Sequence, residues 1–221
     1  MMQITKKYES GRSMVEMIGY MAVIITVTAS IGQLVYKAFG EYKFSKASMQ
    51  VTELANAITK AGAIEANYGR IVDMINGESS VAADNEEGVR MIPSSFKVRG
   101  HSIYHAFGGT VTVGTPSAGS ADTSAKFSIT FHDLNYKQCV DLALKDWSKN
   151  KYVDLDSIFI FKKNEETADG AGATAAWYWP IYGSPYGTFA LPVKMVDVAG
   201  TDDTPGQCQD NDLNSIMWVF N

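Results

Sequence analysis

Twenty consecutive residues without a charged side chain, residues 17–36, constrain this chain more than any other feature. As an α-helix, a segment of this length rises about 30 Å, which matches the hydrocarbon core of a bilayer. A lone strand would leave its backbone polar groups unpaired in lipid, so we expect a membrane-spanning helix. Lys6, Lys7 and Arg12 precede the segment, and this positive flank predicts a cytoplasmic N-terminus with the rest of the chain outside the membrane.

One carboxylate, that of Glu16, stands at the start of this apolar segment and four residues after Arg12. A charge at the middle of a bilayer costs about 2.5–3.5 kcal/mol on insertion scales, and less near the interface. The residues alone leave two interpretations open. Glu16 is either an interfacial carboxylate that reaches the headgroups or a carboxylate that awaits a cationic partner.

Residues 11–17, GRSMVEM, together with the apolar segment that follows them, resemble the processing site of type IV prepilins. The resemblance implies cleavage between Gly11 and Arg12 by prepilin peptidase and N-methylation of the new amino group of Arg12. It also implies that Glu16, then the fifth residue, acts in filament assembly. The first mature residue of this family is usually Phe, Met or Leu, and here it is Arg12. The implied partners are other copies of the chain, the peptidase and the pilus assembly machinery. The implied location is the inner membrane before assembly and an extracellular filament afterwards.

The helix is expected to continue beyond the membrane, because no proline occurs between Lys37 and about Tyr68. Apolar residues recur there at three- and four-residue spacing, which predicts one buried face; they are Val51, Leu54, Ile58 and Ala61. Gly69 is the expected stop. The predicted division of the chain is a leader (1–11), a transmembrane and assembly half of the helix (12–37), an amphipathic half (38–68), a connecting loop region (69–100) and a C-terminal globular domain (101–221).

Alternating apolar patterns predict the strands of the globular domain, at residues 110–113, 127–131, 157–161 and 216–220. Asn135, with Gln138 three residues on, predicts the cap of a short helix. A long helix followed mostly by strands predicts an α+β fold with an antiparallel sheet packed on the helix. This is the type IV pilin fold that the resemblance implies. From Ala106-Phe107-Gly108-Gly109 onward the chain has an expected strand at 127–131, Cys139 on an expected helix and Cys208 shortly before a terminal strand. With these features it is similar to type IVb pilins, including those of conjugative thin pili.

Cys139 and Cys208 are the two cysteines of the chain. They would be free thiols in the cytoplasm and one disulfide outside it, so the predicted export favours the disulfide. In pilins such a bridge bounds the surface-exposed variable region, here residues 139–208. Trp177, Tyr178 and Trp179 lie within it. Two interpretations stay open for these aromatic residues: an interface for filament packing or adhesion, and local packing.

Several classes of function are not expected. A net charge of −5 argues against nucleic-acid binding. His101, His105 and His132 lack metal-ligand spacing, and catalytic motifs are missing from the sequence, so we expect no enzyme and no cofactor. The C-terminal aspartates do not match an EF-hand loop and are expected to form a solvated surface; they are Asp197, Asp202, Asp203, Asp210 and Asp212.

The expected function is that of a structural subunit of a type IV pilus, used for adhesion, aggregation or conjugative contact. Two alternatives remain. One is a minor pilin or a type II secretion pseudopilin. The other is a membrane-tethered extracytoplasmic binding domain that does not assemble.

Overall fold

A computed structural model describes residues 14–65, 68–76, 91–100, 102–115, 126–147, 154–162, 179–182, 200–201, 204–205, 208 and 214–221. The chain forms two compact units, the first ending at Tyr42 and the second beginning at Lys43. We call residues 14–42 the stem and the described residues from Lys43 onward the head.

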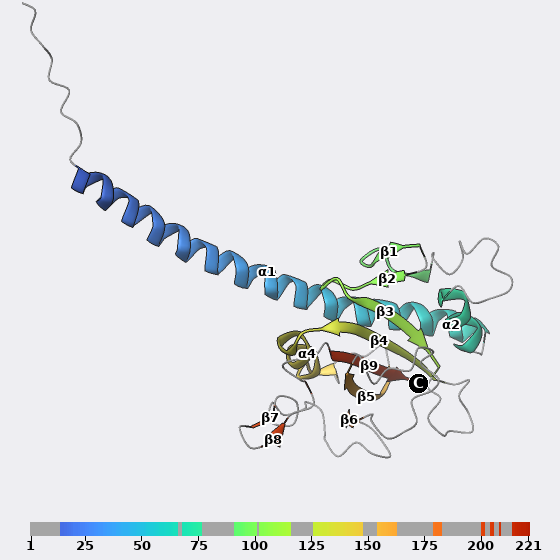
Figure 1. The fold of residues 1–221 in the computed structure, drawn as a ribbon. Coiled ribbons are helices and arrows are strands. Elements are labelled where there is room, and N and C mark those ends of the chain that lie inside the picture. Colours follow the sequence, from blue (N-terminus) through green and yellow to red (C-terminus); the bar gives the residue numbers. More distant parts are fainter. Residues whose placement is uncertain are drawn as a thin grey trace, which may run out of the picture. The chain divides into compact units, whose positions relative to one another are not determined.

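Helix α1 extends from Met14 to Glu65 (Figure 1). It ends before the predicted residue 68, and a second helix, α2 (Tyr68–Asn76), follows. Gly69 is therefore not a helix stop, and the prediction of a connecting loop over residues 69–100 is wrong for α2 and for the strand at Lys97–Arg99. The reason is tertiary burial, because the rest of the head covers one side of this short helix; the buried side chains are Ile71, Val72 and Ile75.

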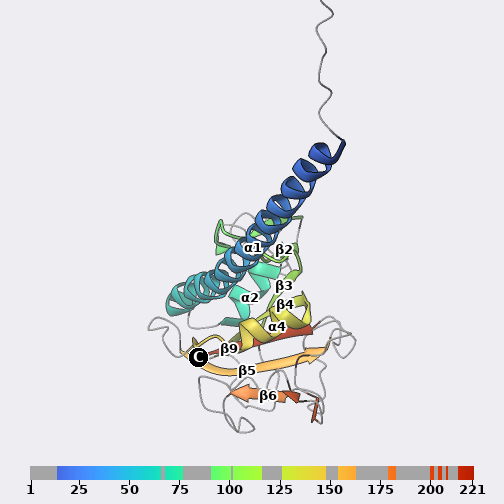
Figure 2. The ribbon, with the colours of Figure 1, turned by 90° about the vertical axis from the view of Figure 1, so that its left-hand side faces the viewer.

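Seven strands form one antiparallel sheet in the order β1-β2-β3-β4-β9-β5-β6. The strands are β1 (Lys97–Arg99), β2 (Ser102–Tyr104), β3 (Thr110–Gly114), β4 (Phe127–Leu134), β5 (Leu155–Lys162), β6 (Trp179–Tyr182) and β9 (Asn214–Phe220). Two short strands, β7 (Gly200–Thr201) and β8 (Thr204–Pro205), pair with each other. The four predicted strands are confirmed as parts of β3, β4, β5 and β9. Strand β9, the last in sequence, lies between β4 and β5 (Figure 2).

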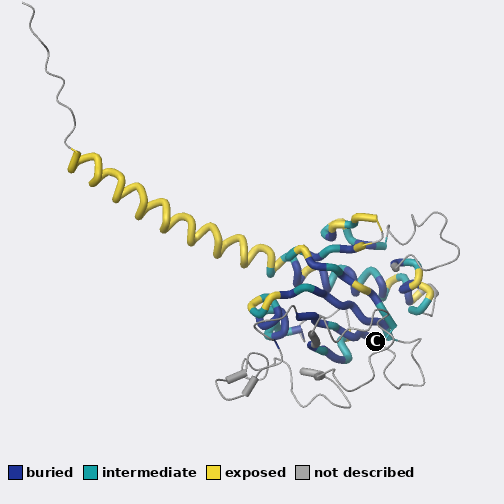
Figure 3. Tube along the Cα trace, viewed as in Figure 1, coloured by how far each residue is buried: buried dark blue, intermediate teal, exposed yellow. Residues whose placement is uncertain are grey.

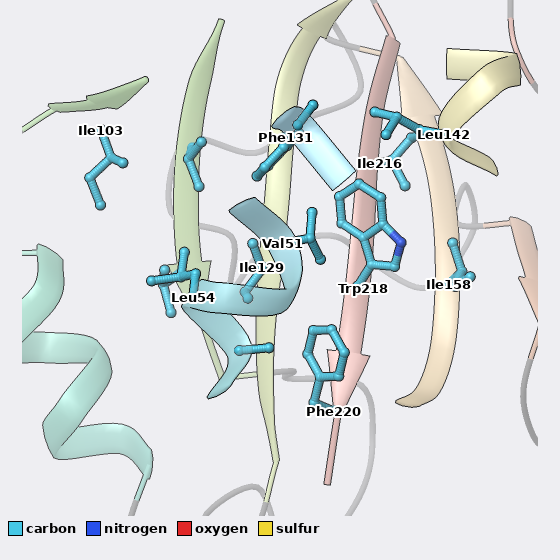
Figure 4. Close-up of a cluster of buried hydrophobic side chains, with 14 of the residues drawn as sticks. Val51, Leu54, Ile103, Ile129, Phe131, Leu142, Ile158, Ile216, Trp218 and Phe220 are labelled. Atoms are coloured by element: carbon cyan, nitrogen blue, oxygen red, sulfur yellow. The ribbon is translucent and has the colours of Figure 1, made fainter. Parts of the chain in front are cut away.

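One face of the sheet carries the hydrophobic core of the head. On β4 the side chains of Phe127, Ile129 and Phe131 are fully buried, as their alternation predicts. They share one buried cluster with the predicted face of α1 and with β9, including Val51, Leu54, Ile58, Ile216 and Trp218 (Figure 4). Ala61, the fourth predicted member of that helix face, is partly buried against the same cluster.

Aromatic contacts place the two short helices on this same face. The ring of Tyr68, at the start of α2, lies 4.9 Å from that of Phe127 between centroids. The ring of Trp147, which follows α4 (Tyr136–Ala143), lies 5.2 Å from that of Trp218. The predicted cap of α4 is confirmed, since the Gln138 amide donates to the Asn135 side chain at 2.9 Å and Gln138 Oε1 accepts from the Asn135 amide at 3.1 Å. The head is thus the α+β fold expected of a pilin.

Candidate functional site

Every residue of the stem is exposed (Figure 3), and residues 17–36 within it carry no charged side chain. An 18-residue window of α1 has a mean hydropathy of 1.8 and none of it is buried, so this helix is long and apolar enough to cross a membrane. Three hydroxyl groups of its apolar segment, those of Thr26, Thr28 and Ser30, are satisfied by backbone carbonyls of the same helix. Thr26 and Thr28 donate to the carbonyls of Val23 and Ile24 at 2.9 and 2.8 Å, which lowers the cost of placing them in an apolar environment.

Glu16 lies in the first turn of α1, and its side chain is exposed. A carboxylate in this position interacts favourably with the positive end of the helix dipole. The predicted cleavage site, Gly11 and Arg12, lies outside the described residues. The stem therefore presents one carboxylate at the start of an apolar helix.

A buried amide joins α1 to the β1–β3 edge of the sheet. Gln50 is 1% exposed, and its Nε2 donates to the Ser95 carbonyl at 2.7 Å. Its Oε1 accepts from the backbone N–H of Ala106 at 2.8 Å. Glu53, nearly one turn further along α1, accepts from the Ser95 hydroxyl at 2.6 Å. Sequence reasoning missed this clasp, although Gln50 lies four residues before Leu54 on the predicted buried face.

His105 stabilises the turn that Gln50 holds. Its Nδ1 accepts from the backbone N–H of Phe107 at 3.2 Å, so its Nε2 carries the proton and donates to the His132 carbonyl at 2.8 Å. The ring stacks on Phe131 with centroids 4.7 Å apart. Burial lowers the pKa of His105 to about 4; the His132 carbonyl and Asp133 oppose this shift, and the charge of His132 adds to it. His105 is therefore neutral at pH 7.

A second histidine crosslinks three strands on the opposite face of the sheet. The Nε2 of His132 on β4 lies 2.8 Å from Thr112 Oγ1 on β3, and its Nδ1 lies 3.0 Å from Ser215 Oγ on β9. Serine and imidazole at this distance also occur in hydrolases. Here Ser215 is fully buried, so a substrate in solution cannot reach it, and the arrangement acts as a polar bridge between strands.

Cys139 and Cys208, the pair expected from the sequence, form a disulfide. It joins α4 to a segment 69 residues further along the chain, and both half-cystines are buried. Of the aromatic residues expected at a surface, Trp179 contributes its backbone to β6, while Trp177 and Tyr178 lie outside the described residues. The C-terminal aspartates that were expected to form a solvated surface also lie outside them.

A long helix packed on an antiparallel sheet, with a disulfide across the head and an apolar stem, is the architecture of a pilin-like subunit. A family model described as PilS N terminal matches residues 45–160, which is more than half of the chain. The chain therefore belongs to this pilin-related family. A search of curated proteins found no match. The family match begins after the stem, so it is independent of residues 11–36, which carry the resemblance to prepilins.

Proposed function

We propose that this chain is a structural subunit of a type IV pilus and that it polymerises through its stem. Among the described residues, the exposed large hydrophobic side chains all lie between Met14 and Met49, and this observation carries the proposal. Residues 17–36 within this range are exposed and carry no charge, and an apolar surface of this length marks a membrane or protein contact. The bilayer covers the stem before assembly, and neighbouring stems cover it in the filament.

Processing would create a cationic partner for Glu16 in the filament. Cleavage between Gly11 and Arg12 frees an α-amino group, and its methylation keeps the positive charge. A subunit that enters the filament in register places its Glu16 beside the amine of Arg12 in a neighbour. In an apolar setting the two charges attract strongly, while either one alone is costly. The pair therefore selects one axial register.

Replacement of Glu16 tests this role. Glu16→Gln and Glu16→Ala should leave membrane insertion unchanged and abolish filaments, as measured by shearing and pelleting. Glu41→Gln is the matched control, because Glu41 is also an exposed acid on α1 and lies outside the apolar segment. Normal filaments from Glu16→Ala would refute the assembly role.

The N-terminus of the native protein distinguishes this proposal from a membrane-tethered domain. Mass spectrometry should find a methylated chain that begins at Arg12. Retention of residues 1–11 would favour the tethered domain. Abundance in sheared filaments distinguishes a major subunit from a minor pilin or a pseudopilin. The type IVb assignment is part of the proposal and is supported by the disulfide between α4 and the segment before β9.

A further inference from the structure

Three exposed aromatic side chains lie where α1 emerges from its charge-free segment. Tyr36, Phe39 and Tyr42 are 84%, 62% and 63% exposed. At about 100° per residue, these positions lie within an arc of about 120° on one side of the helix. Lys37 and Glu41 project from another side. This short segment therefore has an aromatic side and a charged side.

The position of this segment suits the boundary between lipid tails and headgroups. Residues 17–36 are long enough to cross the hydrocarbon core, so the next turns of the helix fall in the headgroup layer. Aromatic rings, and those of tyrosine in particular, are enriched at this depth because they have an apolar body and a polar tip. Lys43 follows Tyr36 by seven residues, on the aromatic side, where its ammonium group can reach lipid phosphates.

We propose that, before assembly, Tyr36, Phe39 and Tyr42 form a collar that seats in the outer headgroup–acyl boundary of the membrane. The collar fixes the depth at which α1 leaves the bilayer. This inference rests on the proposed function, because it requires the stem to span a membrane. The surface that the collar fits is a bilayer that contains anionic lipid. Lys37 and Lys43 lie in the same turns of α1 as the three rings and outnumber the one acid there, Glu41, so they complement phosphate charge.

The test measures which positions the bilayer protects. Full-length protein with its native disulfide is placed in vesicles of phosphatidylethanolamine and phosphatidylglycerol. Single cysteines are then labelled with a membrane-impermeant maleimide: Ala29→Cys within the span, Ala38→Cys within the collar and Ser45→Cys beyond it. We expect protection at positions 29 and 38 and rapid labelling at position 45.

Removal of the rings should move this boundary. In a chain with Tyr36→Ser, Phe39→Ser and Tyr42→Ser, the cysteine at position 38 should label at least about tenfold faster, because the loss of the three rings removes apolar surface that the bilayer would bury. The cysteine at position 29 should stay protected. The matched chain with Tyr36→Trp, Phe39→Trp and Tyr42→Trp keeps aromatic rings and should keep position 38 protected.

The other outcomes separate the two proposals. Unchanged labelling at position 38 in the serine variant overturns the collar. If that variant also fails to form pelletable filaments, the three rings contact a second copy of the chain instead of lipid. Labelling at position 29 in the otherwise native chain would show that the stem does not span the bilayer, which overturns the proposed function as well.

Discussion

The Nε2–H of His105 donates to the backbone carbonyl of His132 at 2.8 Å and so ties the β2–β3 turn to strand β4. The same turn is closed by Gly108, whose N–H donates to the His105 carbonyl at 2.9 Å. It is also held to α1, because the Ala106 N–H donates to Gln50 at 2.8 Å. The turn that the neutral imidazole ties to β4 is thus also bonded to the helix that carries the stem.

The stability of the head should fall with acidification because of His105. The pKa of His105 is about 4 in the folded chain, compared with an ordinary value of 6.5 in the unfolded chain. The unfolded chain therefore takes up the proton first as the pH falls. The contribution of neutral His105 to the free energy of unfolding is fully present above pH 6.5. It decreases as the pH falls from 6.5 to 4 and changes no further below pH 4. A shift of this size corresponds to about 3 kcal/mol. Urea unfolding of the native chain between pH 7 and 4 measures it.

The variant His105→Gln isolates this effect from the carboxylates, which titrate in both chains. The difference in unfolding free energy between the native chain and the variant should be largest at pH 7 and shrink towards pH 4. Parallel curves for the two chains would show that His105 does not titrate as the structure indicates.

Loss of the Gln50 clasp should destabilise the head without affecting the stem. Gln50→Leu removes two buried hydrogen bonds and leaves the Ala106 N–H without its acceptor, which should cost about 2–4 kcal/mol in urea unfolding. Amide exchange at Ala106 should become faster. Met49→Ala is the control, because Met49 is 50% exposed on the same helix, and it should change stability by less than about 1 kcal/mol. Equal effects of the two substitutions would contradict the clasp.

The elements with strong local patterns could be predicted from the sequence. The buried face of α1 follows from the spacing of Val51, Leu54 and Ile58, and the cap of α4 follows from Asn135 and Gln138. These features depend on neighbours three or four residues apart. Glu16 stands out for a similar reason, since a charge beside a charge-free segment is visible without any knowledge of the fold.

The remaining features depend on distant parts of the chain. Helix α2 is only nine residues long, which is too short to be stable alone. Ile71 and Ile75 belong to the core because this helix packs against the rest of the head. The alternating pattern of β9 predicts a strand. Its position between β4 and β5 depends on the whole sheet and is not visible in that pattern. Gln50, His105 and His132 are polar residues that each bond to a residue 27 to 83 positions away along the chain, so sequence spacing does not reveal these contacts.

Removal of a buried hydroxyl from α1 should stabilise the head. The Thr59 Oγ1 atom is buried and, within the part of the chain that the structure describes, has no hydrogen-bond partner. Thr59→Val replaces the hydroxyl with a methyl group of similar size and should raise the free energy of unfolding by about 1 kcal/mol. Thr52→Val is the control, because its hydroxyl donates to the Ser48 carbonyl at 3.4 Å and its removal should not stabilise. A loss of stability in Thr59→Val would indicate a partner such as a buried water.

Gly109 should tolerate no side chain, because a Cβ atom there would overlap the carbonyl oxygen of His132 and lie 2.6 Å from Nε2 of His105. These are the two atoms of the hydrogen bond that ties the turn to β4. Gly109→Ala should therefore separate them and destabilise the head by about 3 kcal/mol or more. It should also expose His105 to water, so the pKa of His105 measured by NMR should rise from about 4 towards 6.5.

Gly108→Ala provides the matched control for this change. Gly108 has a φ of +99°, but a Cβ atom there meets nothing within 4 Å, so the cost is that of the backbone conformation alone, about 1–2 kcal/mol. Because the His105–His132 bond is left intact, the pKa of His105 should stay near 4 in this variant. A rise of that pKa in both variants, or in neither, would show that the close approach at Gly109 does not maintain the bond.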